Sequence, residues 1–420
     1  MRRRTVTFLV AVAACTSVAP AASAPVAATP RRATKNAGDA TIRVLLSVGA
    51  RPTIASPGGL LLTDRDGSLL ARGTREAVWR VERDGRRVRA VRPDGVGTVW
   101  VDMPLRARPM NGALLSVSGT PYRGDLALYA NDTGILVVNV VKIDDYLRGV
   151  VPLEIGTRSD LDSAAVQAQA VTARSYAYIH LASDPARAYD VTGGVLDQVY
   201  GGVAAETPVA SEAVESTRTL VLKYAGRVVN APYHSTCGGS TAAASEIWRS
   251  DDEPYLQRVS DRIPGTERYY CDLSPRFRWT KSLDSPTLNA ALAQYLATYT
   301  SVPGRNPGVA RDVTIGSHTP SGRVGTITIT TDRGNFVLRG NDMRFVLRTP
   351  GGELLNSTYF SVETTPAPNG TIARLTLHGM GYGHGVGMCQ WGAIGRARAG
   401  QDYRMILRTY YPGTTVGPAE

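Results

Sequence analysis

One carboxyl group stands at the end of an apolar segment, residues 143–155. Glu154 lies two residues after Pro152, between Leu153 and Ile155. Apolar surroundings raise the pKa of a carboxyl group because desolvation disfavours its charged form. A carboxyl group that is protonated near neutral pH can act as a general acid. The segment therefore predicts an acid–base residue, although an isolated glutamate beside apolar residues is more often a salt-bridged or solvated structural side chain.

A glycine-rich loop precedes a predicted helix near the C-terminal end. Residues 379–387 hold five glycines around His384, and Gln390 follows them. Such a loop brings backbone close to a ligand and presents N–H donors at the start of the helix. It lacks the lysine of a phosphate loop and the βαβ context of a dinucleotide site. His384 and Gln390 are therefore candidates for binding a neutral polar ligand such as a sugar. A tight packing turn, with His384 bonded to backbone, is the alternative.

Three of the four cysteines lie in the body of the chain, at Cys237, Cys271 and Cys389. His234 and Cys237 have a spacing that zinc sites use, but structural zinc sites take four ligands, and paired Cys-x2-Cys clusters are missing from the sequence. Outside the cytoplasm, a disulfide between Cys237 and Cys271 is the simpler interpretation. We therefore predict this disulfide and no metal or cofactor, with zinc held by His234, Cys237 and Cys271 as the alternative.

Two regions that differ in the spacing of their apolar residues are expected to position these side chains. From residue 41 to 141, short aliphatic runs separated by Gly, Asp, Asn and Pro turns predict a β-rich lobe, which ends on the strand leading to Glu154. Apolar residues three and four apart then predict a helix from Ala164 to about Leu181, begun by a capping box at residues 159–162.

The remaining patterns mix helices with strands. Helices are predicted at residues 207–218, 389–399 and 403–410, and strands at residues 220–223, 228–231, 313–346 and 375–377. The sequence has no internal repeat. The expected fold is α+β: a β-rich N-terminal lobe of residues 41–141, then an interwoven α+β region of residues 142–417.

The N-terminal residues predict export. Three arginines, an apolar run at residues 6–14 and small residues up to Ala24 are typical of a signal peptide of residues 1–24. Residues 12–15 also resemble a lipoprotein box, in which case the signal ends at residue 14 and Cys15 carries lipid. Residues 25–40 then form a disordered linker. No later segment is long and apolar enough to span a bilayer.

The net charge of the 420-residue chain is +11, and removal of the three signal arginines leaves +8. A basic protein outside the cell is attracted to anionic polymers, but the excess of arginine over lysine is also what a high-GC genome produces. Clustered basic residues with interleaved aromatics are missing, and together with the export signal this disfavours a nucleic-acid partner.

The order of several motifs points to a known family. They lie at residues 145–154, 165–177, 190–192, 197–201, 233–241, 383–393 and 406–414. Together they closely resemble the stage II sporulation protein D / amidase enhancer family of bacteria, over about residues 41–417.

This resemblance implies an extracytoplasmic, cell-wall-associated α+β protein that acts on peptidoglycan. The sporulation member of the family is a lytic transglycosylase that cuts glycan strands stripped of stem peptides. By resemblance, Glu154 is the catalytic acid and base. It would protonate the glycosidic oxygen, which leaves as the C4 hydroxyl of N-acetylglucosamine, and then take the proton from the C6 hydroxyl of N-acetylmuramic acid. Water is not the nucleophile, so the second carboxylate of ordinary glycoside hydrolases is not required.

The resemblance also implies a glycan-binding cleft between the loops of the α+β region. Its expected lining residues are Arg174, Gln198, Tyr200, Ser235, His384 and Gln390. The sequence departs from the family at Gln167, where lysine is frequent, and at Cys389, where serine is common. Some members bind zinc near the position of His234.

Two other functions stay open. The first is a non-catalytic glycan-binding protein that stimulates a cell-wall amidase, the role attributed to the enhancer branch of the family. The second is a zinc-stabilised wall scaffold. The expected partners are peptidoglycan glycan strands and, for the enhancer, an amidase. The sequence does not define the oligomeric state.

Overall fold

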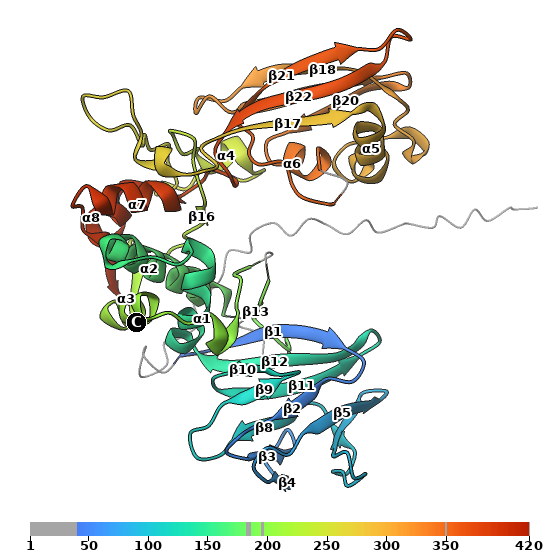
Figure 1. The fold of residues 1–420 in the computed structure, drawn as a ribbon, viewed down its shortest axis with the longest axis vertical. Helices are drawn as coiled ribbons and strands as arrows, with labels where there is room; N and C mark the ends of the chain where they lie inside the picture. Colours follow the sequence, from blue (N-terminus) through green and yellow to red (C-terminus); the bar gives the residue numbers. More distant parts are fainter. Residues whose placement is uncertain (1–39, 182–185, 195–196, 349–350, 420) are drawn as a thin grey trace, which may run out of the picture. The chain divides into compact units, whose positions relative to one another are not determined.

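The computed structural model of the chain describes residues 40–181, 186–194, 197–348 and 351–419, and Figure 1 traces their elements. All of these residues belong to the compact unit of residues 31–420. The predicted signal peptide, Cys15 and the linker up to residue 39 lie outside the described residues. Within the described ranges, no helix has both the length and the hydropathy to cross a membrane. The chain combines helices with several separate sheets and has a β-rich N-terminal region, which confirms the predicted α+β class.

The N-terminal region is built from strands, as predicted. They are β1 (Thr41–Gly49), β2 (Thr53–Ala55), β3 (Leu60–Thr63), β4 (Leu69–Gly73), β5 (Trp79–Asp84), β6 (Arg87–Val91), β7 (Val101–Asp102), β8 (Leu105–Pro109), β9 (Leu115–Val117), β10 (Thr120–Tyr122), β11 (Asp125–Asn131) and β12 (Gly134–Lys142).

These strands form two sheets that share one apolar core. With β13 (Val191–Thr192), the first sheet has the order β13-β1-β12-β11-β8-β3-β4, and the second has the order β10-β9-β2-β5-β6-β7. Leu60 and Leu62 of the first sheet and Val81 of the second are fully buried in the same cluster. Alternate residues of each strand therefore face the space between the sheets, as the period of a β-strand dictates.

Strand β12 continues directly into helix α1 (Ile143–Ile155), which the sequence patterns did not predict. Glu154 lies in its last turn. Pro152 is buried inside the helix and lacks the N–H that would bond a carbonyl of the preceding turn. The helix ends at Gly156, whose φ of 81° is in the left-handed region that favours glycine.

Helix α1 packs into a core made mostly of helices. It contacts α2 (Ser163–His180) and α3 (Pro208–Ser216), and α2 in turn contacts α7 (Gln390–Arg398) and α8 (Tyr403–Tyr410). These four correspond to predicted helices, and α8 matches its predicted bounds. Five alanines of α2 are buried in this core, and their small side chains allow the neighbouring helices to approach closely: Ala165, Ala168, Ala170, Ala173 and Ala177.

The predicted capping box at residues 159–162 is not formed. A 3-10 turn, η2 (Asp160–Asp162), precedes α2, and neither Ser159 nor Asp162 makes a side-chain cap. Instead, Asp162 accepts from Arg398 at 2.7 Å and 3.2 Å. The carboxylate thus pairs with a residue 236 positions away, and this tertiary contact takes the place of the local one.

The C-terminal half contains two further small sheets and two helices on a second core. The sheets have the orders β17-β22-β21 and β18-β19-β20. Their members are β17 (Arg278–Asp284), β18 (Ala310–His318), β19 (Val324–Thr331), β20 (Gly334–Arg339), β21 (Phe360–Pro366) and β22 (Ile372–Met380), with helices α5 (Ser285–Tyr299) and α6 (Asp342–Val346). The predicted β-rich stretch at residues 313–346 is therefore correct up to residue 339, after which the chain is helical.

The remaining elements are short. They are η3 (Gly202–Ala205), β14 (Leu220–Tyr224), β15 (Arg227–Val228), β16 (Tyr233–His234), α4 (Ala244–Ile247), η4 (Tyr270–Leu273), η5 (Pro303–Arg305), β23 (Met388–Cys389) and β24 (Thr415–Pro418). The pairing of β16 with β23 matters most for function, because it brings together two of the motifs found in the sequence.

Candidate functional site

A cavity of about 360 Å³ opens beside Glu154. Four segments form its walls: the end of α1, the residue after β16, the chain that follows η4, and the start of α7. The lining residues are Leu153, Glu154, Ile155, Gly156, Arg158, Ser235, Pro275, Arg276, Gln390, Trp391 and Ile394.

Parallel pairing of β16 with β23 builds one of these walls. Tyr233 is opposite Met388, and His234 is opposite Cys389, so Ser235 emerges next to Gln390. The backbone N–H of Trp391 donates to the carbonyl of Ser235 at 3.0 Å and fixes this register beyond the strands. Two motifs more than 150 residues apart thereby share one surface.

Glu154 is partly buried, and its carboxyl group has two protein donors. The backbone N–H of Val199 donates to Oε1 at 2.8 Å, and the hydroxyl of Tyr233 also hydrogen-bonds the carboxyl group. Burial raises the pKa of Glu154 above its ordinary value, while both hydrogen bonds act in the opposite direction. The net shift is upward, which is the direction that a general acid at neutral pH requires.

A buried polar chain holds Tyr233 in position. Gln198 is fully buried and donates from Nε2 to the Tyr233 hydroxyl at 3.1 Å. The hydroxyl of Tyr146, on α1, donates to Oε1 of Gln198 at 3.3 Å. The chain therefore runs from Tyr146 through Gln198 and Tyr233 to Glu154, so that one helix supplies both of its ends.

Two arginines give the cavity a positive wall. Arg158 donates to the carbonyl of Ile155 at 2.7 Å, and its guanidinium lies 4.8 Å from the centre of the Trp391 ring. The guanidinium of Arg276 lies 4.1 Å from the centre of the Tyr382 ring. Among the described residues that line the cavity, Glu154 is the only one with a carboxyl group. The site therefore suits an anionic or strongly polar ligand and a reaction that needs a single carboxyl group.

Of the residues predicted to bind substrate, Ser235 and Gln390 line the cavity beside Glu154. Gln390 is largely buried and donates to Oε1 of Gln169 on α2 at 3.2 Å. Gln198 stands behind the wall, in contact with Tyr233 rather than with the cavity. The structure thus brings together one part of the predicted set.

Tyr200 and Arg174 do not reach the cavity. Tyr200 is buried, and its hydroxyl donates to Oδ1 of Asn139 at 3.0 Å, in the core next to the N-terminal sheet. Arg174 is fully buried and donates to Asp144 at 2.8 Å and to the carbonyls of Val214 and Leu220 at 3.1 Å each. Its five donors face inward, so its contacts are structural.

His384 is also held by the backbone. Its Nε2 donates to the carbonyl of Tyr233 at 2.9 Å, and its Nδ1 accepts from the N–H of Val386 at 3.1 Å. Burial lowers the pKa of His384 to about 3, so the ring is neutral. A side chain at Gly387 would meet the carbonyl of Pro232 at 2.0 Å, which explains a glycine there. The segment therefore has the contacts of the tight packing turn that was the alternative prediction.

The cysteine prediction needs correction. Cys237 and Cys271 are free thiols with their Sγ atoms 3.4 Å apart, so the predicted disulfide is not present in this structure. His234 is not part of the group either: its Nδ1 contacts the carbonyl of Val386 at 3.1 Å. Instead, the cysteines gather with Cys389 and Asp261.

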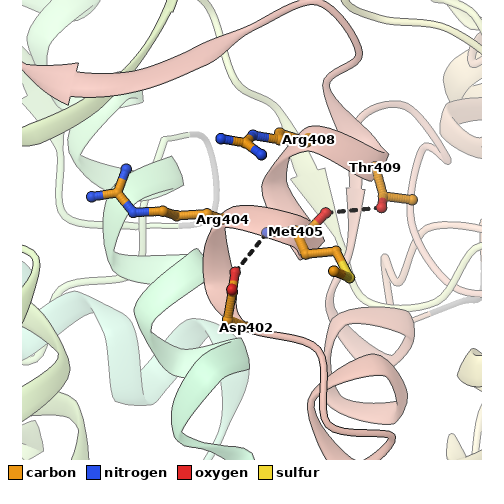
Figure 2. A pocket seen from close by; sticks show the side chains of 5 residues that line it. All are labelled: Asp402, Arg404, Met405, Arg408 and Thr409. Carbon is orange, nitrogen blue, oxygen red and sulfur yellow. Dashed lines mark hydrogen bonds between the residues drawn. The ribbon is translucent and has the colours of Figure 1, made fainter.

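A second depression, of about 290 Å³, lies on the surface of α8 (Figure 2). Asp402, Arg404, Met405, Arg408 and Thr409 line it. Its polar groups serve the helix: Asp402 accepts from the N–H of Met405 at 2.8 Å, and Thr409 donates to the carbonyl of Met405 at 2.9 Å. It shares no lining residue with the Glu154 cavity and contains none of the predicted site residues.

Sequence reasoning missed several residues of the site: Tyr233, Arg158, Arg276 and Trp391. Two of them adjoin residues that were predicted, since Tyr233 lies two positions before Ser235 and Trp391 follows Gln390. Arg158 and Arg276 do not adjoin a predicted site residue, so the sequence did not mark them. Arg276 reaches the cavity only because η4 packs against α7.

Comparisons with known proteins connect this site to a family. Residues 131–224, which include Glu154, match the family described as Stage II sporulation protein, and residues 266–387 match a domain of unknown function (DUF8618). An uncharacterised protein of Brachyspira hyodysenteriae is 32% identical over 302 residues, which cover 72% of this chain and 73% of that protein.

Two relatives carry functional names. The amidase enhancer of Bacillus subtilis is 31% identical over 297 residues, which cover 64% of this chain but only 40% of that protein. Stage II sporulation protein D of the same organism is 28% identical over 299 residues, covering 67% of this chain and 76% of that protein.

Proposed function

Because the chain belongs to the stage II sporulation protein D family, we propose that it is an extracytoplasmic, cell-wall-associated lytic transglycosylase of peptidoglycan, with Glu154 as its single acid and base. Its substrate would be the bond from N-acetylmuramic acid to N-acetylglucosamine in glycan strands that lack stem peptides. The observation that carries this proposal is the partly buried carboxyl group of Glu154, with a raised pKa, on the wall of a cavity.

The proposed reaction uses one carboxyl group twice. Protonated Glu154 donates its proton to the glycosidic oxygen as the bond to C1 of N-acetylmuramic acid breaks, which releases the C4 hydroxyl of N-acetylglucosamine. The Glu154 carboxylate then accepts the proton of the C6 hydroxyl while O6 bonds to C1. The product is a 1,6-anhydro sugar, no water is consumed, and Glu154 is protonated again.

The rest of the cavity supports this substrate. A strand without stem peptides exposes the lactyl carboxylate of each N-acetylmuramic acid. Arg158 and Arg276, on the cavity walls, offer charge-assisted hydrogen bonds to such a group. Trp391 supplies an apolar surface of the kind on which a sugar ring packs. The lack of a second carboxyl group among the described lining residues agrees with a mechanism that needs one.

A second function is a non-catalytic glycan-binding protein that stimulates a cell-wall amidase. Two observations favour it: a relative is named amidase enhancer, and the Glu154 carboxyl group already accepts from Val199 and Tyr233. A glutamate with two protein donors could serve as a structural acceptor. In that case, the cavity would bind glycan without cutting it.

The experiment that separates these functions measures product. The purified full chain is incubated with peptide-free glycan strands, and the digest is analysed by mass spectrometry for 1,6-anhydro saccharides. We expect these products from the native chain and a loss of about 10²- to 10⁴-fold in Glu154→Gln, with glycan binding retained.

Glu215→Gln is the matched control, because it makes the same change at a side chain that is 52% exposed on α3. It should cleave like the native chain. If the native chain binds glycan but yields no anhydro product, the enhancer function is favoured. Hydrolytic products with a reducing end would instead contradict the transglycosylase mechanism.

A further inference from the structure

Four potential metal ligands lie together in the buried core behind the cavity. The Sγ atoms of Cys237, Cys271 and Cys389 and a carboxylate oxygen of Asp261 are all within 4.8 Å of one another, and all four residues are buried. The Sγ of Cys237 is 3.4 Å from that of Cys271 and 3.2 Å from Oδ2 of Asp261. Ligands around a tetrahedral zinc ion are about 3.6 to 3.8 Å apart, given bonds of about 2.3 Å to sulfur and 2.1 Å to oxygen.

Backbone N–H groups point at these sulfurs. Cys389 accepts from the N–H groups of Cys237 and Gly392 at 3.2 Å each, and Cys237 accepts from Gly239 at 3.4 Å. Cys389 also occupies the N-cap of α7. These hydrogen bonds come from outside the group of four side chains and orient the sulfurs, as outer hydrogen bonds do for the ligands of metal sites.

The fourth ligand is oriented from behind. Oδ1 of Asp261 accepts from the Tyr410 hydroxyl at 2.6 Å and from Arg396 at 3.0 Å, which leaves Oδ2 facing the sulfurs. Metal-binding carboxylates are typically held in this way by hydrogen bonds from outside the site. A side chain at Gly392 would meet Oδ2 at 2.1 Å, so the glycine keeps this approach open.

The buried charges around these four side chains also favour a bound divalent ion. Arg323 is fully buried, donates to the carbonyl of Cys237 at 2.7 Å, and leaves Nε and Nη1 without a partner among the described residues. Three thiolates and one carboxylate carry four negative charges. A divalent ion, Arg323 and Arg396 together carry four positive charges. With the ion bound, the buried group is neutral, whereas buried charges without compensation are costly.

We propose that Cys237, Cys271, Cys389 and Asp261 bind one zinc ion in a closed, structural site. Thiolate ligands suit zinc, and a complete set of four protein ligands is typical of structural rather than catalytic zinc. The site uses all three cysteines, whereas the Cys237–Cys271 disulfide would leave the Cys389 thiol reduced beside it. Binding releases the thiol protons and oxidises nothing.

This site would fix the walls of the Glu154 cavity. Ser235 lies two residues before Cys237, Pro275 and Arg276 follow Cys271 closely, and Gln390 directly follows Cys389. Each cysteine therefore anchors a segment that lines the cavity. Zinc would tie these segments together beyond the short pairing of β16 with β23. The proposal does not depend on the chemistry of Glu154.

Metal content is the direct test. The full chain with Cys15→Ser, which removes the one cysteine outside the described residues, is purified and analysed by native mass spectrometry and elemental analysis. We expect one zinc ion per chain, and alkylation under denaturing conditions should find all three remaining cysteines reduced. A chain without metal whose peptide map shows a Cys237–Cys271 disulfide would overturn the proposal.

A variant identifies the ligand set. In the same background, Cys389→Ser should weaken zinc binding by more than 100-fold, because even changes outside the ligand shell cost about 10- to 100-fold. A disulfide between Cys237 and Cys271 would not respond to this change. The native chain loaded with cobalt provides a second readout that does not require a folded variant. We expect the intense absorption of sulfur-to-cobalt charge transfer, and a spectrum without it would contradict thiolate ligation.

Loss of glycan cleavage alone would not bear on this proposal. A chain that binds zinc but makes no anhydro product would keep the metal site and contradict the transglycosylase. A chain that makes the anhydro product without bound zinc would support the transglycosylase and contradict the metal site.

Discussion

The backbone N–H of Val199 donates to Oε1 of Glu154 at 2.8 Å, although the two residues are 45 positions apart. The loop that carries Val199 is itself fixed, since Asp197 accepts from the N–H and hydroxyl of Thr192 at 2.8 Å each and from Tyr176 at 2.9 Å. The carboxyl group therefore has a defined orientation. A group that must give and then accept a proton at two different oxygens benefits from being held in this way.

The hydroxyl of Tyr233 should tune the acidity of Glu154. Its hydrogen bond stabilises the carboxylate and lowers the pKa of Glu154, so Tyr233→Phe should raise that pKa further. Because the acid step needs protonated Glu154, we expect the alkaline limb of the pH–activity profile to move to higher pH. The profile of anhydro-product formation between pH 4 and 9 measures this shift.

Tyr200→Phe is the matched control for this variant. It removes a buried hydroxyl that bonds Asn139 rather than Glu154. Both variants leave a buried partner unsatisfied, at a cost of about 1–3 kcal/mol of stability. The alkaline limb should move only in Tyr233→Phe. An equal movement in both would mean that the hydroxyl acts through general stability and not through Glu154.

Glu154 should also make the folded protein less stable at neutral pH. Its pKa in the folded state is raised above the ordinary value of 4.5, so the folded state binds its proton more tightly than the unfolded state does. Its contribution to stability is complete below pH 4.5 and is lost as the pH rises through the folded-state value. Glu154→Gln, which cannot ionise, should therefore be more stable than the native chain at pH 7 and similar to it at pH 4.

Thermal unfolding at the two pH values tests this expectation, with Glu215→Gln as the baseline for an exposed glutamate. A melting temperature of Glu154→Gln below that of the native chain at pH 7 would contradict it. In that case, the hydrogen bonds to the carboxylate would outweigh its burial.

The two cavity arginines should act on substrate binding more than on the chemical step. If they pair with lactyl carboxylates, Arg158→Gln and Arg276→Gln should each raise KM about tenfold, since a charge-assisted hydrogen bond contributes about 1.5–3 kcal/mol. The effect should shrink as salt increases. Initial rates on peptide-free strands at low and moderate ionic strength measure both quantities.

Arg408→Gln provides the matched control, because Arg408 lines the separate depression on α8 (Figure 2). It lowers the net charge of the chain by the same amount as the cavity variants do. If its KM rises equally, the arginines contribute only a general attraction to an anionic polymer. A selective rise in the cavity variants supports specific contacts.

Local patterns predicted much of the fold and less of the site. Helix α2 follows from apolar spacing, the predicted helices α3, α7 and α8 are also present, and the N-terminal strands follow from short β-branched or aliphatic runs between turn residues. Helix α1 was missed because its valines and Pro152 have low helix propensity; burial against α2 and α3 overrides that preference. Helix α5 carried a readable signal, Asp284 as N-cap followed by Pro286, that the interpretation did not use.

The sequence motifs correctly placed three side chains around one cavity. Glu154, Ser235 and Gln390 meet at the cavity as expected. Arg174 and His384 were misplaced because long polar side chains in a motif look alike whether they face a ligand or a buried carbonyl. The direction in which such a side chain points depends on tertiary packing, which cannot be derived from the spacing or the composition of the sequence. The contact of Cys389 with Cys237 likewise depends on the register of β16 with β23.

Arg174 should support the fold and not the substrate. It extends from α2 to the carbonyls of Val214 in α3 and Leu220 in β14, and its Nε donates to Asp144 at 2.8 Å. Removing one partner of a buried ion pair costs about 3–5 kcal/mol, because the other charge is left without compensation. Asp144 keeps a second cation, Arg218 at 3.7 Å, so Arg174→Met should cost about 3 kcal/mol, at the lower end of that range.

Chemical denaturation measures this loss, and glycan binding by the folded fraction provides the second readout. We expect the midpoint of denaturation to fall while the affinity of the folded protein for peptide-free strands stays within about twofold, since surface and core effects separate when the residues do not touch. Arg218→Met, which removes the exposed partner of Asp144, is the control and should cost less than about 1 kcal/mol. A normal stability with reduced glycan affinity in Arg174→Met would instead restore Arg174 to the substrate-binding surface, and would require its side chain to leave the Asp144 pair when glycan binds.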